Sequence, residues 1–137
     1  MKKNKNLWKD IEALFGFLIK DFRFRITRTS EGRMERFEYV TLEDDELQIE
    51  FIREMGKIGI MVSSVKKSKF RFSLDLIKHL INREEYWCIT NLESHASFLK
   101  DKLNEIKYLF REENIQKSND ELMKLSREEI RWFYKIK

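Results

Sequence analysis

The period of the hydrophobic residues changes twice along this chain and divides it into three stretches. Over residues 7–19, apolar side chains recur every three or four positions, which is the spacing of an amphipathic helix. From Asp21 the pattern becomes a two-residue alternation that continues to Phe72 and indicates strands with one buried face. After Ser73 the helical spacing returns. The pattern therefore predicts an α+β fold with its strands in the middle.

The middle stretch predicts an antiparallel meander of about five strands. The first strand is expected over residues 21–28, with Phe22, Phe24 and Ile26 on its buried face. Gly32, the acidic residues 43–45, Gly56 and the lysine-rich residues 66–69 supply turns, and such short links join antiparallel neighbours. The remaining strands are expected near residues 33–42, 47–51, 58–62 and 70–72.

The last stretch predicts three to four helices packed on one face of the sheet. Ser73 is a candidate N-cap for a helix ending near Asn82, and a long apolar stripe runs over residues 91–111. Ser118 and Ser126 each precede a glutamate by three positions, as in a capping box, so we expect two short closing helices. One continuous helix with Ser126 inside it is the alternative. No linker or repeat interrupts the chain, and residues 1–137 are expected to form a single domain.

Composition does not change the predicted fold, but it indicates the size of the core and the cellular compartment. The chain is 42% hydrophobic and 13% aromatic, enough for one well-filled core. Its one cysteine, Cys88, has no partner for an internal disulfide, which fits a reducing compartment. The uncharged runs 13–19 and 58–65 are too short to span a bilayer, and no signal-peptide pattern follows the basic start. We expect a cytoplasmic protein with no membrane contact.

Charge is distributed unevenly, although the formal net charge is only +4. Residues 43–56 hold six acidic residues and one basic residue, whereas residues 57–72 hold five basic residues and no acidic one. Six carboxylates around one turn and its following strand would attract a basic protein partner. The alternative is a solvated turn. The predicted partner-binding residues are Glu43, Asp44, Asp45, Glu46 and Glu50, with Tyr86 and Trp87 as aromatic anchors.

A basic sheet face is the second candidate, and its ligand would be nucleic acid. Cations that could contact phosphates recur on the first and last strands. The same cations could instead pair across strands with Glu35, Glu38 and Glu50, and base-stacking aromatics at fixed positions are not evident, so pairing is favoured. The residues of this alternative are Arg23, Arg25, Lys66, Lys67, Lys69 and Arg71.

No catalytic, metal or cofactor site can be assembled from the sequence. His79 and His95, with Cys88 between them and Asp75 one helical turn before His79, are the only set that resembles metal ligands. Their spacing lacks the close pairs typical of zinc sites, so no metal is predicted. No glycine-rich phosphate loop is present, and Cys88 lies in an apolar stretch where a thiol is usually buried. We therefore expect a binding protein without a cofactor and not an enzyme.

Two short motifs carry a resemblance to a known class of proteins. Asp21-Phe-Arg-Phe24 leads from a helix into the strand meander, and Phe72 to Ile77 closes it with Phe-Ser-Leu-x-Leu-Ile. In this layout, residues 7–110 resemble small bacterial immunity proteins of polymorphic-toxin and contact-dependent-inhibition systems. The resemblance implies a cytoplasmic protein that binds and neutralises one cognate toxin. It implies no catalytic residue.

Overall fold

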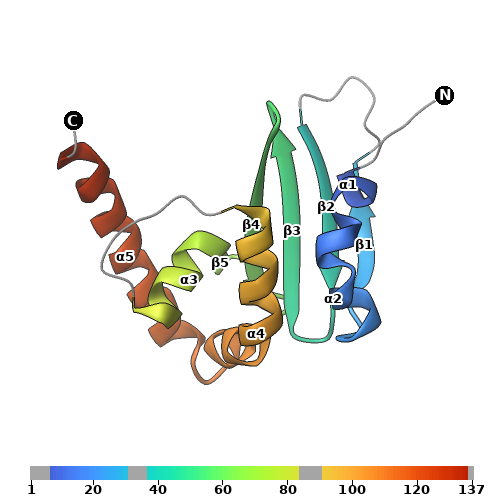
Figure 1. Cartoon of the computed structure of the whole chain (residues 1–137). Coiled ribbons are helices and arrows are strands. Elements are labelled where there is room, and N and C mark those ends of the chain that lie inside the picture. The colour runs from blue at the N-terminus through green and yellow to red at the C-terminus, as the bar shows by residue number, and fades with distance from the viewer. Residues whose placement is uncertain (1–6, 31–36, 84–90, 136–137) are drawn as a thin grey trace.

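The structure, a computed structural model, describes residues 7–30, 37–83 and 91–135, with side chains described as far as Trp132. Two helices precede a five-stranded sheet and three helices follow it (Figure 1). The helices are α1 (Leu7–Phe15), α2 (Phe17–Lys20), α3 (Leu74–Asn82), α4 (Leu92–Phe110) and α5 (Ile115–Lys135). The strands are β1 (Arg25–Thr29), β2 (Phe37–Glu43), β3 (Leu47–Glu54), β4 (Lys57–Ser64) and β5 (Arg71–Ser73).

The sheet is a simple meander in which each strand pairs antiparallel with the next, in the order β1-β2-β3-β4-β5. The links 44–46 and 55–56 enforce the pairing of β2, β3 and β4, because a two- or three-residue link can only return the chain beside the strand it left. The predicted α+β fold, with an N-terminal helix, an antiparallel meander and C-terminal helices, is confirmed.

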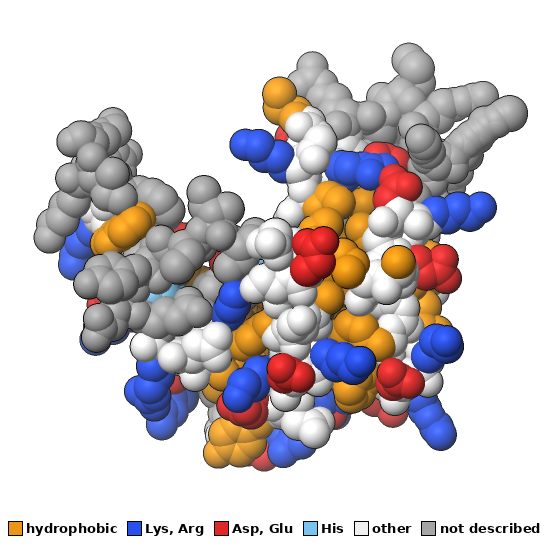
Figure 2. Space-filling view, viewed as in Figure 1, with side chains coloured by type: hydrophobic (Ala, Val, Ile, Leu, Met, Phe, Trp, Pro, Cys, Tyr) orange, Lys and Arg blue, Asp and Glu red, His pale blue; other side chains and the backbone are white. Residues whose placement is uncertain are grey.

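One face of the sheet forms the core with the helices. Val40, Phe51 and Ile60 lie opposite one another on neighbouring strands, and all three are buried. The ring of Phe15 on α1 packs edge-on against Phe51, with the ring centroids 4.8 Å apart. Figure 2 shows this helical side, where charged side chains lie over α1, α2 and α4 and hydrophobic side chains are visible between them. Burial of these aromatic and branched side chains provides the main stabilising term.

Side-chain caps set the beginnings of α3 and α4. The Ser73 hydroxyl accepts a hydrogen bond from the amide of Leu76, and the Asn91 side chain accepts one from the amide of Ser94. The predicted ends of both helices therefore agree closely with the structure. Helix α3 packs against β4 and β5, and α5 packs against α3 and α4.

The first strand differs from its prediction. Arg23 has φ +64°, which interrupts extended backbone, so β1 begins only at Arg25. All five residues of β1 are exposed, including Ile26 at 39%. The pairing with β2 also shifts register between Ile26 and Arg28, as in a β-bulge. Phe24, just before β1, is buried as predicted, and Phe22 is half-buried, but the prediction was wrong for Ile26, because β1 is an edge strand and no covering layer reaches that residue.

The closing segment also differs, because α5 is one helix and not two. Ser118 and Ser126 both lie inside it, and Ser118 is buried at 2% exposure. Leu122 is fully buried, and no glycine or proline interrupts the helix. Continuous burial of one helical stripe outweighs two optional caps, since serine is tolerated inside a helix. Among the described residues, none of the helices combines the length and apolar character needed to cross a membrane.

Candidate binding surface on the open sheet face

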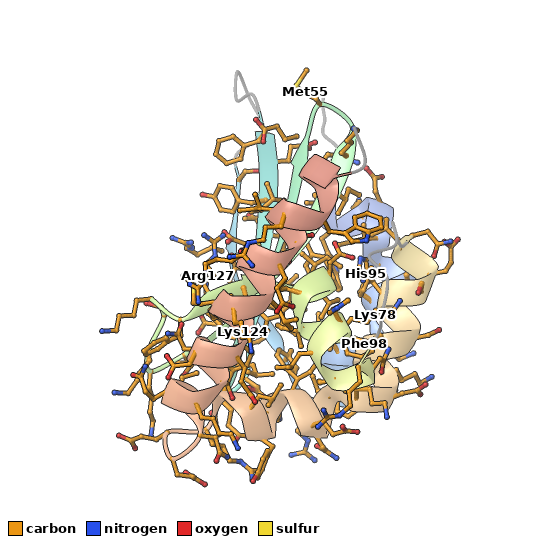
Figure 3. All side chains as sticks on the ribbon, turned by 90° about the vertical axis from the view of Figure 1, so that its left-hand side faces the viewer. Met55, Lys78, His95, Phe98, Lys124 and Arg127 are labelled. Carbon is orange, nitrogen blue, oxygen red and sulfur yellow. The ribbon has the colours of Figure 1, made fainter. Side chains whose placement is uncertain are left out.

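The sheet face opposite the core is exposed where β2, β3 and β4 approach the β3–β4 turn, and it is half-buried or buried at its centre. Its side chains extend away from α1 and α4, which lie on the other side of the strands (Figure 3). Phe37 at the start of β2 is 45% exposed, and Gly59 on β4 is exposed with no atom within 4 Å of where a Cβ would lie. We call this surface the open face.

Glu50 is the centre of an ion cluster that spans the whole width of the open face. It lies on β3, and its carboxylate is paired with Arg28 of β1, at 3.9 Å, and with Arg71 of β5. The Glu50 side chain is only 12% exposed, while those of Arg28 and Arg71 are 62% and 42% exposed. We call this cluster the Arg–Glu–Arg bridge. In this cluster the carboxylate is buried and the two guanidinium groups face solvent.

Thr41 lies beneath the bridge on β2, directly opposite both Arg28 and Glu50 in the strand register. It is fully buried, and its hydroxyl has no hydrogen-bond partner among the residues that the structure describes. A buried hydroxyl without a partner lowers stability, because it gives up its hydrogen bonds to water. The open face is therefore buried at Thr41 and Glu50, in contrast to its exposed part near the β3–β4 turn.

Apolar side chains lie beside the bridge toward the β3–β4 turn. Tyr39, Ile52 and Gly59 face one another across β2, β3 and β4, and Met61 lies opposite Glu50. The Phe37 and Tyr39 rings pack with centroids 6.1 Å apart. Gly59 has no side chain, so the surface is recessed there, next to Ile52 and Met61. Apolar area next to fixed charges is typical of protein interfaces.

The acidic turn predicted as a binding site is partly occupied by contacts within the chain. Asp44 Oδ1 accepts hydrogen bonds from the amides of Glu46 and Leu47, both at 2.8 Å, and Asp44 Oδ2 lies 2.6 Å from Lys107 Nζ of α4. Burial alone would raise the pKa of Asp44, but the amide of Leu47, the Lys107 ammonium and the amide of Glu46 outweigh it and lower that pKa. Asp44 thus holds the β2–β3 turn onto α4.

The other predicted carboxylates have different roles. Glu46 lies 3.5 Å from Lys107 and 3.5 Å from Arg111, and Glu43 accepts a hydrogen bond of 3.3 Å from the Thr27 hydroxyl. Asp45 is exposed and makes no ion pair with any residue that the structure describes. Glu50, grouped with this turn in the sequence, belongs to the open face instead. Tyr86 and Trp87, the predicted anchors, lie outside the described residues.

The predicted basic residues fall in three places. Arg25 and Arg71 lie on the open face, opposite Glu43 and Ser63 in the strand register, and Arg23 precedes β1. Lys66, Lys67 and Lys69 occupy the link between β4 and β5. There Lys66 and Lys67 line a cleft of about 240 Å³ that also contains acidic residues: Asp45, Glu46, Glu112 and Glu113. The basic link therefore lies next to carboxylates.

The residues considered as metal ligands meet in part where the C-terminal helices pack. His95 Nε2 of α4 lies 3.3 Å from Asp75 Oδ1 of α3, and the histidine side chain is 8% exposed. Figure 3 shows His95 and Lys78 in this region. Burial, together with the nearby Asp75, raises the pKa of Glu129 on α5. Cys88 lies outside the described residues, and the described part of the chain contains no group of histidine, cysteine and carboxylate side chains that could hold a metal.

Tyr39 and Thr41 are site residues that sequence reasoning missed. They are recognisable only once the register is known, because the register places Thr41 opposite both Arg28 and Glu50, and Tyr39 opposite Ile52. The available signal was the alternation of β2, in which Tyr39 and Thr41 occupy the face opposite Val40 and Leu42.

Comparison with known proteins adds no relative from which a role could be transferred. The chain matches no protein-family model, no curated protein and no solved structure.

Proposed function

We propose that this chain is an immunity protein, a binding protein that neutralises a cognate bacterial toxin, and that it contacts the toxin through the open face. The single observation that carries this proposal is the open face itself, with the Arg–Glu–Arg bridge beside half-buried apolar side chains and the exposed Phe37 farther along β2. Such a surface has the mixture of aromatic, aliphatic and arginine side chains that is enriched in protein interfaces. The sequence resemblance to immunity proteins supplies the class of partner.

The open face is favoured over the acidic turn as the contact surface because its charged groups are available. Asp44 and Glu46 already contact Lys107, so a basic partner would have to compete with a close internal ion pair. Arg28 and Arg71 keep most of their N–H donors free of Glu50, since one carboxylate cannot accept them all. The acidic turn remains the alternative contact surface, with Asp45 as its exposed carboxylate.

The direct test is affinity capture from the native host after nuclease treatment, with variants that block one surface at a time. Gly59→Tyr fills empty space on the open face and suits a strand, so the protein should fold and lose its partner. Ala13→Tyr makes the same addition on an exposed position of α1 and should retain it. Loss of the partner in both variants, or in neither, would contradict the choice of surface.

The captured protein must also behave as a toxin. Expressed alone it should arrest growth, and co-expression of the wild-type chain, but not of Gly59→Tyr, should restore growth. If the captured protein does not arrest growth when expressed alone, the chain is a binding protein but not an immunity protein.

Nucleic-acid binding is the second candidate function. The observation that favours it is the exposure of Arg25, Arg71 and the three lysines of the β4–β5 link. Binding carried by phosphate contacts would weaken steeply as salt is raised. A titration of the chain with single- and double-stranded oligonucleotides at two salt concentrations tests this role, and undetectable binding at low salt would remove it.

A further inference from the structure

The exposed charges of the open face are mostly cations. Arg25, Arg28, Lys57 and Arg71 are exposed, and Glu54 is the only exposed carboxylate among the outward-facing strand residues. The remaining outward-facing acids of these strands are less exposed: Glu43 is half-buried, and Glu50 is 9% exposed. A molecule that approaches this face therefore meets positive charge first.

The Arg–Glu–Arg bridge is already arranged to receive another acceptor. Glu50 draws Arg28 and Arg71 toward the centre of the sheet from opposite edges, and its single negative charge leaves the cluster with a net charge of +1. Each guanidinium presents five N–H donors in a fixed fork, and a carboxylate pairs with two of them at once. A second carboxylate above Glu50 would neutralise the cluster, and both guanidinium groups have N–H donors left for it.

The aromatic residues of the open face argue for protein over nucleic acid. Arg28 lies over the Tyr39 ring at 5.7 Å from its centroid, and Phe37 packs against the same ring. A base that stacked on Tyr39 would have to displace one of these neighbours, whereas aliphatic side chains can lie on the adjoining surface of Ile52 and Met61. The recess at Gly59 admits such a side chain between them.

We propose that the open face binds an acidic segment of a protein partner, whose carboxylate is held jointly by Arg28 and Arg71 and whose neighbouring apolar side chains lie on Tyr39, Ile52 and Met61. This inference rests on the proposed function and adds the chemistry of the partner. It also reverses the polarity expected from the acidic turn, which would select a basic partner.

The probe for this chemistry is a library of short random peptides displayed on phage and selected on the folded wild-type chain. Selected sequences should combine Asp or Glu with aliphatic residues. A synthetic peptide of the selected sequence should bind Arg28→Gln and Arg71→Gln about tenfold more weakly, the effect of one charge-assisted contact. Arg28→Lys, which keeps the charge but loses the fork, should fall between Arg28→Gln and wild type.

Lys20→Gln is the matched control, because it removes an exposed cation at the end of α2 on the helical side and should leave the affinity unchanged. Circular dichroism spectra of all variants exclude unfolding as the cause of weaker binding. Selected peptides that are basic, acidic peptides whose affinity is the same in both arginine variants, or displacement of the peptide by oligothymidine would each overturn the proposal.

Two failures can be told apart with Gly59→Tyr. If the selected peptides are not acidic but Gly59→Tyr still blocks them, the open face binds protein and only the carboxylate chemistry is wrong. If Gly59→Tyr blocks no selected peptide, or selection enriches none, the open face is not the docking surface and the proposed function loses its site.

Discussion

Two ion clusters of this protein differ in which of their charges are covered. At the β2–β3 turn, Asp44 and Lys107 pair at 2.6 Å with side-chain exposures of 11% and 17%, so both charges lie between sheet and helix. On the open face the acid is sunken but the two arginines face solvent. A pair with both members covered fixes the fold. A cluster that covers only the anion keeps its cations available to a ligand.

The largest effect is expected from Asp44→Ala. This change leaves the amides of Glu46 and Leu47 without their acceptor and removes the closer of the two carboxylates at Lys107, and should lower the free energy of unfolding by about 2–3 kcal/mol. Urea denaturation measures it. Asp45→Ala removes an exposed neighbour and should change stability by less than about 0.5 kcal/mol. Equal losses in the two variants would show that Asp44 does not fix the turn.

The pH dependence of Asp44 gives the next effect. Its pKa is lowered in the folded state, so its ionised form contributes stability that is fully present above the unfolded-state pKa of about 3.9. That contribution is lost as the pH falls through the lower, folded-state pKa. Wild type should therefore exceed Asp44→Asn in stability at neutral pH, and the two should converge in acid. A constant difference over the whole range, followed by urea denaturation, would contradict the role of the charge.

A smaller effect is expected from Glu50→Gln on the open face. The amide oxygen can still accept a hydrogen bond from Arg71, and both arginines are exposed enough to stay hydrated, so the loss should remain below about 1 kcal/mol. Asp44→Asn is the same chemical change, carboxylate to amide, in the covered Asp44–Lys107 pair, and it should lower the free energy of unfolding more than Glu50→Gln does. The comparison of the two clusters fails if Glu50→Gln is the more damaging substitution in urea.

The smallest effect is expected from Thr41→Val, where the sign of the change in the free energy of unfolding is the result of interest. Valine keeps the shape and strand preference of threonine but removes the buried hydroxyl, which has no partner in the described part of the chain, so stability should stay constant or rise by up to about 1 kcal/mol. Thr27→Val serves as control. It removes a hydroxyl that bonds to the Thr41 carbonyl and to Glu43, and should lower the thermal midpoint. A marked loss in Thr41→Val would mean that its hydroxyl is satisfied.

The fold was predictable from the sequence because its signals are local. Alternation of Leu47, Ile49 and Phe51 marks a strand wherever that strand pairs, and Ser73 caps α3 through an amide only three residues away. The predictions were wrong where tertiary packing determines burial or helix length. The exposure of Ile26 depends on the position of β1 at the sheet edge, and the continuity of α5 depends on the burial of Leu122.

The site was less predictable because it depends on register. Charge counting grouped Glu50 with Asp44, although the pleat places Glu50 on the open face and the turn places Asp44 against α4. Arg71 was assigned to a nucleic-acid surface and Glu50 to a protein surface, yet the two form one cluster. A run of like charges in sequence therefore does not indicate a shared surface when the run crosses from a turn into a strand.

The most direct measurement is site-specific photocrosslinking in the native host. A benzophenone amino acid in place of Phe37, an exposed aromatic residue at the edge of the open face, samples that face, and the same group at Asp45 samples the acidic turn. We predict one crosslinked protein from position 37 and none from position 45, with the crosslink weakened by Arg28→Gln and by Gly59→Tyr. A crosslink from position 45 alone would contradict it and return the binding site to the acidic turn.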